Sequence, residues 1–312
     1  MVIKMNVVDQ YYDIIDECCM FLNEKLHINY FDSLIRVAND ILYEINDSKL
    51  DDEDINFLEE KYQSLMNLKI TNEEVRLSMQ LLIIKAMKHI NMNLEIMTPD
   101  YINYVIGYLI KSYFENKKDK ISILDVEVGT GNLINAVSNF IDNECDLIGV
   151  DHNQLLIDLC KVNSELQNNE ISLYFQDTLT EIMEEVDVII GDLDGTEDNG
   201  KYYPYEILLN YIHNLKEHGL FIYLIENDFF SKTSLDDFKN NFQGTFLGLI
   251  VLPQNLFNAN HIGKSILVGC GKKINNFEMM IMQLSDLNNK EKFMNDIKEI
   301  QEWIIKIKEI EK

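Results

Sequence analysis

Arginine is nearly absent from this sequence, and basic residues in general are scarce. Arginine occurs only at Arg36 and Arg76, and 53 Asp and Glu residues face 27 Lys and Arg residues, for a net charge of −26. A protein that binds duplex DNA unaided usually presents a basic face whose contacts release counterions. The composition therefore counts against tight nucleic-acid binding. We interpret the excess charge as a solvated acidic surface, and we expect any DNA or RNA partner to be bound weakly.

The sequence also lacks paired cysteines, a leader segment and long apolar runs. Its five cysteines form an odd set without a C-x-x-C pair, which predicts neither a disulfide framework nor a zinc knuckle. No charged-then-apolar segment opens the chain, and no apolar run reaches the roughly 18 residues that a membrane span needs. We therefore expect a reduced, cytoplasmic protein that does not enter a membrane.

Glycine and proline are missing between Val7 and Asn91, where apolar residues recur at helical spacing. This pattern predicts an all-helical segment. The acidic run 51–54 is expected to begin one of its helices, because negative side chains are stabilised at the positive end of the helix dipole. We assign residues 1–95 to a helical N-terminal domain.

Beyond this segment the period of the apolar residues changes. Thr98 and Pro99 are expected to open a helix that runs to Tyr113, with Thr98 as N-cap and Pro99 in the first helical position. Short apolar strands then alternate with helices, which predicts an α/β fold with a doubly wound, mostly parallel sheet. The expected strands are 121–124, 147–150, 171–175, 186–190, 220–225, 245–252 and 265–269, the last two forming an antiparallel edge pair.

An amphipathic helix is expected at the end of the chain, over residues 290–311. Phe293, Ile297, Ile300 and Ile304 share one stripe, which predicts that the helix packs on another element. Docking on the N-terminal helices is the simpler interpretation, and a homodimer contact is the alternative. The sequence thus predicts three parts: residues 1–95, an α/β domain at 96–274, and a C-terminal helix within 275–312.

The strongest chemical signal is a buried strand that ends at Asp125 and runs into a glycine turn and a helix. Gly129 and Gly131 allow the backbone to turn sharply and to approach a ligand closely. The position where a dinucleotide fold has its third glycine holds Ile134, which argues against NAD, and no G-K-[ST] phosphate loop is present at this turn. The turn is therefore expected to bind another ligand at the carboxyl end of the sheet.

Two further aspartates follow the next two expected strands. Asp151 lies twenty residues after Gly131, where a carboxylate can accept hydrogen bonds from both ribose hydroxyls of a nucleoside. Asp177 can accept a hydrogen bond from the amino group of an adenine. Each aspartate alone is more often an ordinary strand-end or N-cap residue. Three strand ends in succession with carboxylates favour a nucleoside-binding site.

This combination resembles the class I S-adenosylmethionine (SAM)-dependent methyltransferases. Within them it is similar to the adenine-N6 DNA methylase branch, including the YtxK-like group of Firmicutes. The resemblance covers roughly residues 96–273 and rests on the turn at 123–133, on Met97-Thr98-Pro99, and on the pair 252–257 and 263–268. It implies a Rossmann-like methyltransferase domain with SAM as the cofactor.

The resemblance also implies roles for individual residues. Asp125, Gly129 and Gly131 would hold the methionine part of SAM, Asp151 the ribose and Asp177 the adenine, and Thr98 would add a polar contact. Glu127 stands where the family has a small residue beside the cofactor. We expect its carboxylate to turn outward to water; the alternative is that it repels the carboxylate of the methionine part.

The sequence departs from the family at the strand that would face the substrate. The family has Asn/Asp-Pro-Pro-aromatic there, whereas this chain has Gly-Asp-Leu-Asp-Gly at 191–195. Asp192 can still accept a hydrogen bond from a substrate amine, and Tyr202, Tyr203 or Tyr205 could supply the lost stacking face. A packed loop is an equally good interpretation of these tyrosines. Asp192-x-Asp194 lacks further ligands at suitable spacing, so we expect no metal site.

Two functions remain open at this stage. The first is a methyltransferase that acts on an amine, formally adenine-N6 DNA methylase-like, without sequence readout of its own because the residues after Gly271 are expected to hold a single helix. The second is a catalytically weakened relative that binds SAM or a nucleoside and acts as a regulatory or interaction protein. The altered 191–195 segment and the acidic charge support the second.

Overall fold

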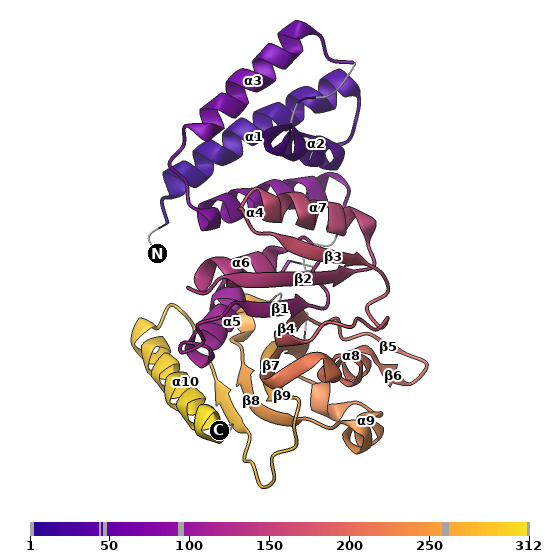
Figure 1. Cartoon of the computed structure of the whole chain (residues 1–312), viewed down its shortest axis with the longest axis vertical. Coiled ribbons are helices and arrows are strands. Elements are labelled where there is room, and N and C mark those ends of the chain that lie inside the picture. The colour runs from indigo at the N-terminus through magenta and orange to yellow at the C-terminus, as the bar shows by residue number, and fades with distance from the viewer. Residues whose placement is uncertain (1–2, 44, 46–48, 93–96, 258–261, 311–312) are drawn as a thin grey trace. The chain divides into compact units, whose positions relative to one another are not determined.

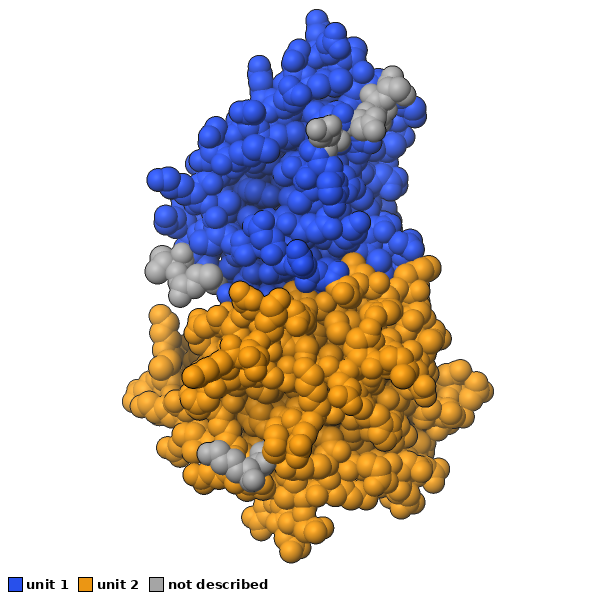
Figure 2. Space-filling view, viewed as in Figure 1, with its two compact units in different colours: residues 1–98, 129–139, 153–171 blue, residues 99–128, 140–152, 172–312 orange. Residues whose placement is uncertain are grey.

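The protein is described by a computed structural model that covers residues 3–43, 45, 49–92, 97–257 and 262–310. The chain forms two compact units, each assembled from three stretches (Figure 2). Unit 1 contains residues 1–98, 129–139 and 153–171, and unit 2 contains residues 99–128, 140–152 and 172–312. The predicted boundary at residue 95 lies outside the described residues, and the predicted division into three parts stays a prediction.

Unit 1 is helical, and its core joins the N-terminal helices to a helix from the α/β part of the sequence. Leu159 packs with the buried side chains of the first four helices. The predicted helix start in the acidic run is confirmed, because Asp51 is an N-cap that forms a capping box with Asp54. The helices are α1 (Met5–Leu26), α2 (Tyr30–Leu42), α3 (Asp52–Met66), α4 (Asn72–His89), α6 (Asn132–Phe140) and α7 (Gln154–Glu165).

Unit 2 is built on an eight-stranded sheet with the order β10-β8-β9-β7-β4-β1-β2-β3 (Figure 1). β1 pairs in parallel with β2 and β4, and β4 pairs in parallel with β7, so the predicted α/β class is confirmed. The predicted antiparallel pair is confirmed as β8 and β9. The strands are β1 (Ile121–Asp125), β2 (Cys145–Asp151), β3 (Ile171–Phe175), β4 (Val186–Asp192), β7 (Leu215–Glu226), β8 (Thr245–Val251), β9 (Lys264–Cys270) and β10 (Met280–Gln283).

Several elements differ from the sequence-based expectations. Pro99, not Thr98, is the N-cap of α5 (Asp100–Tyr113), and no side chain caps that helix. β10 was not predicted, and neither was the small hairpin of β5 (Glu197–Asp198) and β6 (Lys201–Tyr202). The hairpin turns at Asn199 and Gly200, which both have left-handed φ, as an Asn-Gly turn requires.

The C-terminal helix α10 (Lys290–Ile310) packs within unit 2. Its buried stripe includes Trp303, whose ring lies against Gly248 of β8, and Phe293 contacts the Tyr101 ring of α5. The expectation that this stripe docks on the N-terminal helices is therefore wrong, because α5 and β8 already cover it. The remaining elements of unit 2 are α8 (Tyr203–Tyr211), α9 (Leu235–Asn241) and short 3-10 turns. None of the helices that the structure describes is long and apolar enough to span a membrane.

Candidate functional site

Three neighbouring strands of unit 2 end in aspartates at one edge of the sheet. Asp125 ends β1 and pairs in register with Gly149 of β2 and Ile190 of β4, so Asp151 and Asp192 lie two residues beyond its partners. Parallel strands bring their carboxyl ends to the same edge, which is where open α/β sheets bind ligands. Asp125, Asp151 and Asp192 therefore lie at the same edge of the sheet.

Asp125 is buried, and only one of its two carboxylate oxygens has a hydrogen-bond partner among the described residues. Its side chain is 1% exposed, and Oδ1 accepts a hydrogen bond from the backbone N–H of Glu127 at 3.3 Å. Oδ2 has no hydrogen-bond partner among the residues that the structure describes. Burial, and then the nearby carboxylates, raise the pKa of Asp125 well above its usual value. A buried polar atom without a partner is costly, and such atoms concentrate at functional sites.

Glu127 is partly buried and its carboxylate is hydrogen-bonded within unit 2, so the expectation that it turns outward to water is not met. Its Oε2 accepts a hydrogen bond from the backbone N–H of Asp194 at 3.4 Å, and the Tyr203 hydroxyl donates to the same carboxyl group. Burial raises the pKa of Glu127 to about 8, assisted by the charges of Asp192 and Asp194. At neutral pH the group is therefore mostly protonated, and it carries little charge beside Asp125.

Asp192 is paired with a lysine from another strand. Lys264, the first residue of β9, places its Nζ 2.5 Å from Asp192 Oδ1. This contact was missed by the sequence analysis, in which Lys264 was noted only as part of a motif. A second lysine, Lys232, lies 2.7 Å from Asp228 and 3.9 Å from Glu226. Despite these carboxylates, no group of three or more His, Cys, Asp or Glu residues in the described parts of the chain is arranged to hold a metal ion.

The tyrosines after this segment have different environments. Tyr202 is fully buried among the rings of Tyr205 and Phe229, with Lys232 Nζ 4.6 Å from its ring centroid. Tyr205 is also buried, and its hydroxyl donates to the Phe229 carbonyl. Neither ring presents a face on which a base could stack, so for both the packed-loop interpretation holds. Tyr203 is only partly buried, and its hydroxyl reaches Glu127 and Thr178.

Asp151 and Asp177 lie at the carboxyl ends of the neighbouring strands β2 and β3, but they differ in exposure. Asp151 is buried, and its backbone carbonyl accepts a hydrogen bond from the N–H of Gln176 at 3.1 Å. Asp177 is exposed and follows directly. Its carboxylate accepts from the Leu179 N–H at 2.8 Å, and its carbonyl accepts from Thr180. Asp177 therefore belongs to a local turn next to the end of β2.

The glycine turn itself belongs to unit 1. Gly129 and Gly131 have φ values of 52° and 76°, in the left-handed region that favours glycine. A Cβ at Gly131 would lie 2.8 Å from Cys160 Sγ and 2.9 Å from Asn135 Nδ2, so the turn is packed against α6 and α7. Thr98 is buried and contributes its carbonyl, which accepts a hydrogen bond from Asn132 Nδ2 at 2.9 Å.

Known proteins match both the N-terminal helical segment and the remainder of the sequence. Residues 9–87 match the family model of the YtxK N-terminal helical domain. The chain is 26% identical over 266 residues to the uncharacterised protein YtxK of Bacillus subtilis, which covers 78% of this chain and 80% of that protein.

Two solved structures resemble nearly the whole chain. A class I SAM-dependent methyltransferase candidate from Listeria monocytogenes has a TM-score of 0.83 at 24% identity, covering 96% of this chain and all of that one. The methyltransferase subunit of a type I restriction-modification system from Streptococcus thermophilus has a TM-score of 0.57 at 15% identity, covering 92% of this chain and 74% of that one. The protein therefore carries a YtxK-like N-terminal helical domain and the fold of the class I SAM-dependent methyltransferases.

Proposed function

We propose that the protein binds SAM at the glycine turn and the adjoining strand ends, and that it catalyses methyl transfer from SAM to an amine. The observation that carries this proposal is the buried Oδ2 of Asp125, which lacks a partner in the described structure and lies four residues before a left-handed glycine. A cationic amino group, such as that of the methionine part of SAM, would satisfy this oxygen. SAM supplies the methyl group, and the residues of this chain bind and orient.

The other cofactor roles follow the order of the strand ends. Gly129 and Gly131 let the backbone approach the methionine part, and the buried Asp151 accepts the ribose hydroxyls. Asp177, exposed in its turn, accepts the adenine amino group, and Thr98 supports the turn through its carbonyl. Glu127 is mostly protonated at neutral pH, so it does not repel the carboxylate of the methionine part. Its position beside the cofactor is therefore compatible with SAM binding.

Asp192 and Tyr203 are the proposed acceptor-side residues. The Asp192 carboxylate accepts an N–H of the acceptor amine and shares its charge with Lys264. Positioning of the amine lone pair dominates such a reaction, so a fixed carboxylate is sufficient for the task. The resemblance of the sequence motifs to adenine-N6 DNA methylases makes an adenine in DNA or RNA one candidate acceptor, bound weakly because of the acidic composition. We assign the reaction to the cytoplasm. Mass measurement in solution distinguishes a monomer from a homodimer.

Cofactor binding is tested by calorimetric titration with SAM and with S-adenosylhomocysteine. We expect the natural sequence to bind both and Asp151→Ala to bind at least about tenfold more weakly, through loss of charge-assisted hydrogen bonds. Asp146→Ala is the matched control, because it removes an exposed aspartate from the other end of the same strand. Absence of binding by the natural sequence would refute the proposal.

Methyl transfer is tested with labelled SAM against DNA, RNA and protein extracts. We expect incorporation into one of these, with loss in Asp192→Ala and a change in rate in Lys264→Met, because Lys264 holds the Asp192 carboxylate. Transfer that is unchanged in Asp192→Ala would remove Asp192 from the acceptor site.

A second candidate function is a SAM- or nucleoside-binding regulatory protein without transferase activity. The ion pair between Asp192 and Lys264 favours it, because the lysine occupies the carboxylate that an acceptor amine would use. The burial of Tyr202 favours it too, because the stacking platform is missing. Tight binding of SAM with no transfer to any extract would support this second function over the first.

A further inference from the structure

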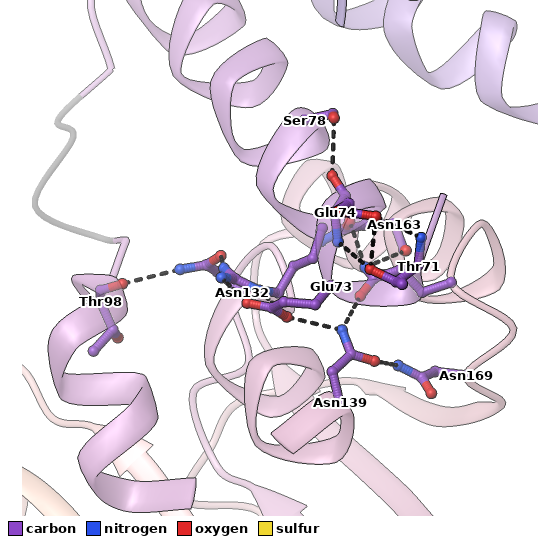
Figure 3. Close-up of polar contacts among 11 residues, drawn as sticks. Thr71, Glu73, Glu74, Ser78, Thr98, Asn132, Asn139, Asn163 and Asn169 are labelled. Carbon is purple, nitrogen blue, oxygen red and sulfur yellow. Dashed lines mark hydrogen bonds and ion pairs between the residues drawn. The ribbon is translucent and has the colours of Figure 1, made fainter. Parts of the chain in front are cut away.

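Unit 1 contains a buried ion pair whose contacts lead to the glycine turn. Figure 3 shows Glu73 of this pair together with Asn132, Asn139 and Asn163. Arg76 and Glu73 both lie on α4, and their side chains are 0% and 1% exposed. The guanidinium donates through Nε and Nη2 to the two carboxylate oxygens of Glu73, at 2.8 and 2.5 Å. Burying such a pair adds little or no stability compared with apolar residues of the same size. Its specific partners therefore indicate what it does.

A first route runs from Arg76 directly to the turn. The Nη1 atom of Arg76 donates to Asn132 Oδ1 at 2.6 Å. Asn132 follows Gly131 in the chain and begins α6, and its Nδ2 donates to the carbonyl of Thr98 at 2.9 Å. Asn132 is the residue on the carboxyl side of the turn, and Arg76 thereby fixes the orientation of its amide.

A second route runs from Glu73 to the same turn through three amide side chains. Asn139 Nδ2 donates to Glu73 Oε2 at 3.1 Å and to Gln167 Oε1 at 2.8 Å. Gln167 Nε2 donates to Asn163 Oδ1 at 2.9 Å, and Asn163 Nδ2 donates to the carbonyl of Thr130 at 3.0 Å. The two routes begin at one ion pair and end on either side of Gly131, so they close into a ring.

We infer that the Arg76–Glu73 pair is a positioning unit that sets the conformation of the Gly129–Gly131 turn from within the helical domain. The two glycines of this turn have no side chains to hold them, so their left-handed conformation depends on surrounding contacts. The ring supplies two of those contacts, at Thr130 and Asn132, and it starts from α4, which lies almost wholly within the YtxK-like domain at residues 9–87. The helical domain then controls cofactor affinity, an inference that rests on the proposed binding of SAM at this turn.

The test compares the only two arginines of the chain. Arg36→Met is the matched control, because Arg36 is also paired with an acid on its own helix, Asp40 at 2.9 Å, within the same unit. We expect Arg76→Met to weaken SAM binding about tenfold and to speed amide hydrogen exchange across residues 130–135. Arg36→Met should leave both unchanged relative to the natural protein. Equal exchange at 130–135 in the two variants would overturn the inference.

Two further measurements keep the test decisive. If Arg76→Met does not fold, Asn139→Ala interrupts only the second route at a partly buried position, and faster exchange at Thr130 is still expected; unchanged exchange there would overturn the inference. If the natural protein binds no SAM, the proposed function fails. The exchange experiment without ligand then still decides whether the ring holds the turn, so the two failures are distinguishable.

Discussion

Two buried charged sites of this molecule, the Arg76–Glu73 pair of unit 1 and Asp125 of unit 2, differ in how their polar atoms are hydrogen-bonded. In unit 1 the buried Arg76 meets both oxygens of Glu73 and the amide of Asn132. In unit 2 the buried Asp125 leaves Oδ2 without a partner in the described structure, and the pKa of Glu127 rises to about 8. This difference distinguishes buried charges that stabilise the fold from buried charges that bind a ligand.

The largest expected effect comes from breaking the satisfied pair. Glu73→Ala leaves Arg76 charged and buried without its carboxylate, which should lower the free energy of unfolding by about 3–5 kcal/mol. Urea denaturation followed by circular dichroism measures this loss. Glu59→Ala removes an exposed glutamate of the helical domain, and it should stay within about 0.5 kcal/mol of the natural protein. Similar losses in both variants would show that the buried Arg76–Glu73 pair does not stabilise the fold more than an exposed glutamate does.

Asp125→Asn should have opposite effects on binding and on stability. The amide removes a buried carboxyl group with a raised pKa, so the free energy of unfolding should stay equal or rise by about 1 kcal/mol. SAM affinity should fall about a hundredfold, because the charge-assisted contact to the cofactor is lost. Calorimetric titration and urea denaturation of the same sample measure the two effects. A variant that loses stability while keeping its affinity would show that Asp125 is structural.

The raised pKa of Glu127 predicts a pH dependence of stability. Between the ordinary glutamate pKa and about 8, the unfolded chain has an ionised Glu127 while the folded protein keeps it protonated. The folded state binds more protons there, so stability falls as pH rises, by roughly 3 kcal/mol from pH 5 to pH 8. Denaturation at a series of pH values should show this slope, and Glu127→Gln should flatten it. An identical slope in that variant would assign the effect to other groups.

Tyr203→Phe should produce the smallest change. It removes the hydroxyl that donates to Glu127, so stability at pH 8 should fall by about 0.5–1.5 kcal/mol. Because that hydrogen bond lowers the pKa of Glu127, its loss should also move the pH-dependent decrease in stability to higher pH. The same pH series measures both effects. A shift to lower pH would mean that the hydroxyl does not donate to Glu127.

Local patterns in the sequence were sufficient for much of the fold. The acidic run that begins α3 and the strand that ends at Asp125 were predicted because capping and apolar periodicity act over a few residues. The Asn199-Gly200 turn was overlooked although its dipeptide is a strong hairpin signal.

What the sequence analysis missed depends on contacts between distant residues. The pairing of Lys264 with Asp192 needs the order of strands in the sheet, and the burial of Tyr202 needs the ring of Phe229 beside it. The docking of α10 depends on α5 and β8, which an amphipathic stripe alone does not specify. The hydrogen bonding of the Glu127 carboxyl group likewise depends on Tyr203, 76 positions later in the chain.

Unit 1 is assembled from three stretches of sequence separated by stretches of unit 2. The first stretch supplies most of the helical core, but Leu159 of α7 completes it from the third. Cutting the chain at residue 98 would therefore separate the four N-terminal helices from a side chain that belongs to their own core.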